Sequence, residues 1–144
     1  MPTEQTPGGL QALCDAHRLH RDLRLVLGDG GRALSAVVPE MWLGADEGDA
    51  VHGGILATVI DVAAVFALIA ATGHDWSTVD LRLDYLRPVR TAALSVTSEP
   101  LHVGRSLARV QSRLLDESGA LSVVGSGTFR RGPQLDRRGA EEDR

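Results

Sequence analysis

The chain has no lysine, no asparagine and only one cysteine, Cys14, among its 144 residues. A single cysteine cannot form an intrachain disulfide or a cysteine metal cluster, which suits a reducing compartment. The first residues are polar and include proline, where a secretory signal would need a basic segment and then an apolar one. We therefore expect a cytoplasmic protein.

Aromatic residues are also scarce, at 3% of the chain, and the net charge at pH 7 is -4. Nucleic-acid-binding surfaces need excess positive charge and often aromatic side chains on which bases can stack. We expect no nucleic-acid partner.

What the chain does contain is the composition of one globular domain, 43% hydrophobic and 24% charged. Residues 1–8 are polar with two prolines, and residues 131–144 are charged without an apolar period, so both are predicted to be mobile tails. The predicted domain covers residues 9–130.

Hydrophobic periodicity predicts the order helix, hairpin, long helix and four strands. The helix is expected over residues 9–17, the hairpin over 23–38 and a loop over 41–51. The four strands are expected over residues 79–85, 92–101, 106–115 and 121–129. In the first of them, Val79, Leu81, Leu83 and Tyr85 alternate with charged residues, as in a half-buried strand. Without alternation of strands and helices, this order indicates an α+β fold with an antiparallel sheet curled round one helix.

Residues 53–72 form an apolar run of helical length that contains one acidic residue, Asp61. A helix that is apolar on every face lies inside a protein or in a membrane. Much of this run is alanine, and an aspartate at mid-membrane costs about 2.5 to 3.5 kcal/mol. We therefore expect a central helix covered by the sheet, and no membrane partner.

Asp61 and the start of this helix suggest a site. A carboxylate among apolar residues needs pairing, protonation or water, and a structural hydrogen bond is the alternative to a catalytic role. The helix opens with His52, Gly53 and Gly54, where backbone N–H groups without side-chain cover could bind a developing oxyanion. A plain glycine turn is the alternative interpretation there.

The spacing of these groups predicts a dimer. Eight residues of helix place Gly53 and Asp61 about 12 Å apart along one axis. One carbonyl group cannot contact both, so the donor and the carboxylate must come from different subunits. Two antiparallel helices would bring each Gly53 opposite the other chain's Asp61, in a homodimer with two equivalent sites.

The motifs VHGGILATVID, STVDLRLDYLRP, HVGRSLARV and GSGTF resemble the hotdog-fold acyl-CoA thioesterases of the phenylacetic-acid-pathway and 4-hydroxybenzoyl-CoA thioesterase type. The resemblance spans roughly residues 9–130. It implies a sheet wrapped round a long central helix, and dimers often paired into tetramers. It also implies hydrolysis of acyl-CoA without a metal or other cofactor, coenzyme A being part of the substrate.

By this resemblance, Asp61 is the nucleophile or the general base for water, and the Gly53 amide donates to the thioester oxygen. His52 and Gly54 help to shape the site. Thr78 matches a family Ser or Thr that holds a water or the carboxylate, although an ordinary strand threonine is the alternative.

The sequence departs from the family pattern at Asp46, where many relatives have Asn or Gln six residues before the histidine. An ionised carboxylate cannot supply the donor of an amide. Either Asp46 takes the place of that amide in the substrate site, or the loop is displaced by one residue. The alternative is that Asp46 is one of three acids on a solvated loop.

Three arginines are candidates for the CoA phosphates, because guanidinium groups suit phosphate. Arg87 and Arg105 rank first, since they fall within matched motifs, and Arg90 follows. Each could instead be a solvated surface charge.

The sequence leaves other functions open. A non-catalytic acyl-CoA or acyl-carrier-protein binding module is one alternative. A hotdog hydratase or dehydratase is a weaker one, because its motifs His-Phe-Pro-Gly and Asp-x-Asn-Pro-x-His are absent. The acyl group, the carrier, and the choice between dimer and tetramer are not specified by the sequence.

Overall fold

The computed structural model describes residues 7–39, 43 and 50–135. Its helices are α1 (Pro7–Asp15), α2 (Arg18–Asp22), the short 3-10 helix η1 (Asp29–Gly31) and α3 (Gly53–Thr72). Its strands are β1 (Val26–Gly28), β2 (Ala33–Val37), β3 (His74–Tyr85), β4 (Ala93–Val103), β5 (Leu107–Leu115) and β6 (Leu121–Gln134).

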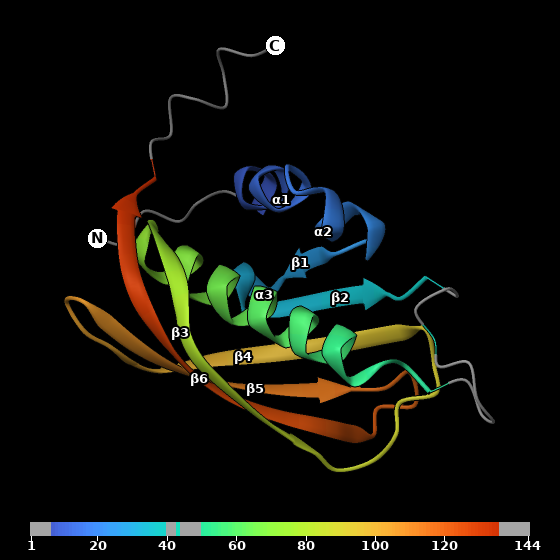
Figure 1. Ribbon diagram of the computed structural model, residues 1–144. Helices are drawn as coiled ribbons and strands as arrows, with labels where there is room; N and C mark the ends of the chain where they lie inside the picture. The colour runs from blue at the N-terminus through green and yellow to red at the C-terminus, as the bar shows by residue number, and fades with distance from the viewer. Residues whose placement is uncertain (1–6, 40–42, 44–49, 136–144) are drawn as a thin grey trace.

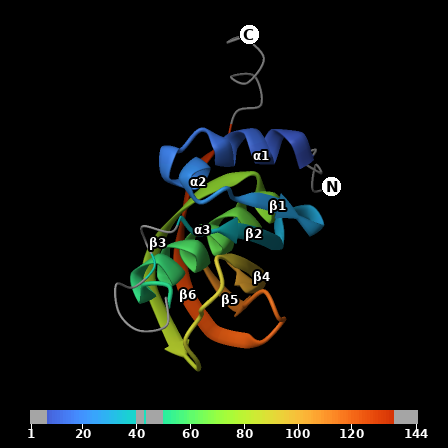
Figure 2. The same ribbon diagram turned by 90° about the vertical axis from the view of Figure 1, so that its right-hand side faces the viewer.

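The six strands form one antiparallel sheet in the order β1-β2-β4-β5-β6-β3, so β1 and β3 are its edges. The sheet curves round α3, while α1 and α2 lie on the side away from β5 (Figures 1 and 2). The predicted α+β hotdog architecture, a sheet wrapped round a long central helix, is confirmed.

Helix α3 begins and ends where the sequence predicts. His52 caps its first turn by accepting the Gly54 N–H through the side chain, and Gly73 ends it in the left-handed conformation at φ 72°. Of the described helices, only α3 is long and apolar enough to cross a membrane, a criterion that core helices also meet. Its buried side chains, among them Ile60 and Leu68, belong to the core beneath the sheet.

Gly125 in β6 allows α3 to lie close to the sheet. A Cβ atom at Gly125 would be 2.7 Å from the Ile60 Cγ2 atom. Glycine inside a strand commonly marks such a close approach. Asp61 follows Ile60, and this contact brings the helix near β3, which pairs with β6.

A β-bulge at Val79 makes the side chains of β3 depart from the strict alternation that the sequence predicts. Thr78 and Asp80 pair with consecutive residues of β6, so Val79 is the extra residue. A bulge reverses the inside and outside alternation on its two sides. Val79 is consequently 58% exposed, against the predicted pattern, and Thr78 shares the inner face with Leu81.

The predicted boundaries need other corrections. β3 starts at His74 and β6 runs to Gln134, because these two ends pair with each other. α1 starts at Pro7, so regular structure extends past both predicted domain limits. Helix α2 was not predicted, and β1 is shorter than expected, since residues 23–25 are not in the strand. Most of the predicted loop 41–51, including Asp46, lies outside the described residues.

Candidate active site at the β3 edge

Asp61 is held by a hydrogen bond from Thr78. The Thr78 hydroxyl donates to Asp61 Oδ1 at 2.5 Å. Asp61 is half-buried rather than enclosed, and Thr78 is exposed, so the pair lies open at the edge of the sheet. The hydroxyl leaves the second carboxylate oxygen available to a substrate or a water molecule.

In the first turn of α3, one backbone N–H group has no hydrogen-bond acceptor among the described residues. The Gly54 N–H binds the His52 ring at 3.0 Å, and the His52 carbonyl accepts from Ile55 and Leu56. No acceptor for the Gly53 N–H occurs among the described residues. A Cβ atom at Gly54 would lie 3.1 Å from the His52 ring nitrogen, so glycine there makes room for the cap.

Tyr85 is a residue of this region that sequence reasoning missed. Its hydroxyl donates to the Gly53 carbonyl at 2.7 Å, and its side chain is half exposed. The available signal was that it is the only tyrosine of the chain and lies in the quoted motif LRLDYLRP.

Both halves of the candidate site therefore contact the same edge strand. Thr78 touches Asp61 near the start of β3, and Tyr85 touches Gly53 at its end. Since α3 is one continuous helix, Gly53 and Asp61 are about 12 Å apart along its axis. A single chain thus presents two half-sites on one free sheet edge.

The three candidate arginines do not lie together. Arg87 follows β3, and its N–H donates to the Ser122 carbonyl at the start of β6. Arg105 lies in the turn between β4 and β5. Strand β5 separates these ends, and its 9 residues span about 30 Å. Arg90 follows Val89, whose carbonyl accepts from Val51 beside the start of α3, so Arg90 belongs to the same end as Arg87.

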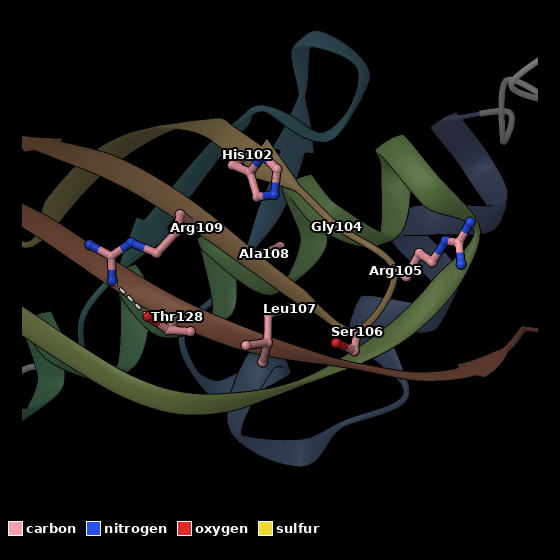
Figure 3. A pocket seen from close by; sticks show the side chains of 8 residues that line it. All are labelled: His102, Gly104, Arg105, Ser106, Leu107, Ala108, Arg109 and Thr128. Atoms are coloured by element: carbon pink, nitrogen blue, oxygen red, sulfur yellow. Dashed lines mark hydrogen bonds between the residues drawn. The ribbon is translucent and has the colours of Figure 1, made fainter.

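Arg105 borders an open pocket of about 370 Å³ on the outer face of the sheet. Figure 3 shows its guanidinium at one end of this pocket and Arg109 at the other, with Leu107 between them. Arg109 is engaged with Thr128 and lies 3.8 Å from Asp80. Arg105 is thus the more available cation of this pocket.

Neither a metal cluster nor a reactive cysteine competes with this site in the described part of the chain. No group of three or more His, Cys, Asp or Glu side chains there could hold a metal ion. Burial, and then the nearby Asp15 carboxylate, raise the pKa of Cys14 to about 11. A thiol of this kind is a poor nucleophile.

Comparisons with known proteins agree with this architecture. The sequence profile of the Thioesterase superfamily matches residues 48–123, just over half of the chain. The medium/long-chain acyl-CoA thioesterase YigI of Escherichia coli is 30% identical over 93 residues, covering 54% of this chain and 60% of that protein. The chain thus spans about 60% of the length of this curated relative.

Two solved structures have the same fold. The Escherichia coli PaaI protein of the phenylacetic acid degradation operon matches with a TM-score of 0.80 at 18% identity, covering 92% of this chain and 99% of that one. A hypothetical thioesterase of Streptococcus pneumoniae, solved with coenzyme A, matches with a TM-score of 0.66 at 22% identity, covering 72% and 80%. With a profile match over half of its length and a sheet wrapped round one long helix, this chain belongs to the thioesterase superfamily.

Proposed function

We propose that this protein hydrolyses an acyl-CoA or acyl-carrier thioester to a carboxylic acid and a free thiol. The observation that carries the proposal is the Asp61 carboxylate, held by Thr78 at a free sheet edge. The spare Gly53 N–H at the same edge supplies a matching donor. Membership of the thioesterase superfamily, and the acyl-CoA thioesterase named among its relatives, support this reaction class.

The working site is proposed to form between two chains. If β3 pairs with β3 of a second copy in antiparallel register centred near Leu81 and Arg82, Thr78 lies beside the partner's Tyr85. Thr78 holds Asp61, and Tyr85 contacts Gly53, so the same symmetry brings Asp61 towards the partner's Gly53. Each dimer then has two equivalent sites.

The exposure of β3 supports this pairing. Val79 and Leu86, on and just after the strand, are 58% and 57% exposed, and Tyr85 is 51% exposed. An edge strand with open hydrogen-bonding groups readily pairs with another strand. A homodimer is therefore proposed as the working unit, and a pair of dimers as a further assembly.

In the proposed reaction, the partner's Gly53 N–H donates to the thioester carbonyl oxygen and stabilises the charge that develops there. Asp61 then acts in one of two ways. As a nucleophile it forms an acyl anhydride that water hydrolyses, and as a general base it takes a proton from the attacking water. In both routes the C–S bond breaks, the thiolate leaves and is protonated, and the acyl group departs as a carboxylic acid.

The positions of the three candidate arginines at opposite ends of the sheet are consistent with the same dimer. Arg105 lies towards the Thr78 end of the sheet, whereas Arg87 and Arg90 lie towards the Tyr85 end. Antiparallel pairing would bring Arg105 of one chain to the same end as Arg87 and Arg90 of the other. We propose that the CoA phosphates are bound by arginines from both subunits, with no metal or other cofactor.

Release of free thiol from a panel of aryl, short-chain and medium-chain acyl-CoAs, followed with a thiol-reactive dye, tests the reaction. Cys14 is buried with a raised pKa of about 11, so the protein itself contributes little signal. Asp61→Asn should abolish most turnover, while Asp22→Asn, the same change on the exposed surface of α2, should not. Thioester binding without turnover by the unaltered protein would instead identify a non-catalytic binding module.

A further inference from the structure

The proposed mechanism requires the Gly53 N–H to have a fixed orientation. A catalytic donor must point in one fixed direction before the substrate arrives. Glycine is the residue with the greatest backbone freedom, and Gly53 stands at the first position of α3, where helix ends fray.

The structure holds the two peptide groups on either side of the Gly53 Cα. The group before it is fixed through the His52 carbonyl, which accepts from Ile55 at 2.9 Å. The group after it is fixed at both ends: the Gly54 N–H binds the His52 ring, and the Gly53 carbonyl binds Tyr85. With both groups fixed, the Gly53 N–H has one direction.

Tyr85 is the only one of these contacts that comes from outside the helix turn itself. Its ring atoms lie 3.5 Å from the position of a Cβ atom on Gly53, so the ring packs against the glycine and the hydroxyl binds its carbonyl. It belongs to β3, which also carries Thr78. One strand thereby fixes both the carboxylate and the donor.

We propose that Tyr85 is a positioning residue: its hydroxyl fixes the Gly53–Gly54 peptide group and so restricts rotation at the Gly53 Cα, which keeps the Gly53 N–H on the other side of that atom directed at the thioester oxygen. This inference rests on the proposed function and adds a residue to it. Tyr85 acts through Gly53 and forms or breaks no bond of the substrate.

Tyr85→Phe removes only the hydroxyl, and Thr58→Val is its matched control. The Thr58 hydroxyl also donates to a carbonyl of the first helical turn, that of Gly54, at 3.0 Å. Removing an oxyanion donor lowers kcat by about 100- to 1000-fold, so loosening one should lower it by about 5- to 50-fold. We expect this loss in Tyr85→Phe with KM within about twofold, because the donor acts mainly in the transition state. Thr58→Val should stay near the unaltered protein.

The outcomes separate the inference from the proposed function. Unaltered kcat in Tyr85→Phe, or an equal loss in both variants, would overturn the positioning role. Absence of thioester hydrolysis by the unaltered protein would instead overturn the proposed function.

A second measurement does not depend on how well Tyr85→Phe folds. Because Tyr85 is the only tyrosine in the chain, growth on 3-fluorotyrosine labels this residue alone. Its single ¹⁹F resonance should shift when a non-hydrolysable acyl-CoA thioether is added, and calorimetry reports binding in parallel. Binding without a shift would contradict a place for Tyr85 beside the reacting group.

Discussion

The Thr78 hydroxyl donates to the Asp61 carboxylate at 2.5 Å, joining the middle of the central helix to the edge strand of the sheet. Hydroxyl-to-carboxylate bonds of this length are charge-assisted and stronger than neutral ones. The contact depends on the bulge at Val79, which gives Thr78 the face that meets the helix. Helix, bulge and hydroxyl together fix the orientation of the carboxylate.

Thr78→Val keeps the shape of the side chain and removes this donor, so we expect a large loss of activity. Hydrogen bonds to charged groups contribute about 1.5 to 3 kcal/mol, which corresponds to a fall in kcat of about 10- to 150-fold. Thr78→Ser should recover most of the activity, and Thr97→Val on an exposed position of β4 should have little effect. A Thr78→Val enzyme with the kcat of the unaltered protein would show that the contact is only structural.

The sequence was sufficient to predict α3 and its acid, because an apolar run of helical length with one carboxylate has few structural solutions. It was insufficient for the direction of Thr78. Strict alternation through Val79 and Leu81 turns Thr78 away from the helix, and one extra residue in the strand reverses that. The bulge arises from pairing with β6, a long-range contact that no local pattern in β3 reveals.

The contact made by Tyr85 is a second feature that local sequence patterns do not predict. Alternation predicted that it shares a face with Leu81 and Leu83, but its contact with Gly53 joins residues 32 positions apart. The sequence motifs rank Arg87 and Arg105 together as phosphate ligands, whereas the sheet places them at opposite ends of β5. Three-dimensional neighbours of this kind follow from topology, which the sequence motifs alone did not provide.

Arg105→Ala should raise KM for acyl-CoA by about 3- to 10-fold, a modest effect because solvent and salt screen a phosphate contact on an exposed surface. It should leave kcat nearly unchanged, because such a contact stabilises the bound substrate and the transition state equally. KM for the corresponding acyl-pantetheine, which lacks the nucleotide phosphates, should not change. Arg113→Ala, on an exposed position of β5, is the control for a general loss of positive charge. Equal effects on both substrates would rule out recognition of the nucleotide by Arg105.

Gly31 should be among the positions least tolerant of alanine. It has φ +91°, and a Cβ atom there would lie 2.5 Å from the Ala70 Cβ atom and 3.0 Å from Leu10. Left-handed strain and overpacking should lower the free energy of unfolding by about 2 to 4 kcal/mol in Gly31→Ala. Gly119, with φ +85° and open space around it, should lose only about 1 to 2 kcal/mol. Urea unfolding curves measure both, and equal losses would mean that the packing against α3 can relax.

Gly53→Pro offers a clean deletion of the proposed donor. Proline has no N–H and is well tolerated at the first position of a helix, which Gly53 occupies. The preceding residue, His52, already has the extended conformation that proline requires of its neighbour, with φ -55° and ψ 131°. The variant should fold with a similar melting temperature and lose about 100-fold or more in kcat.

Mixing two inactive variants tests most directly whether Asp61 and Gly53 act across a dimer. Asp61→Asn and Gly53→Pro chains are unfolded together in equal amounts and refolded. Half of the dimers should then contain one chain of each kind, and in these one of the two sites is intact, so the mixture should recover about a quarter of the unaltered activity. Activity no higher than that of the separate variants, although mixed dimers are present, would contradict a site shared between two chains.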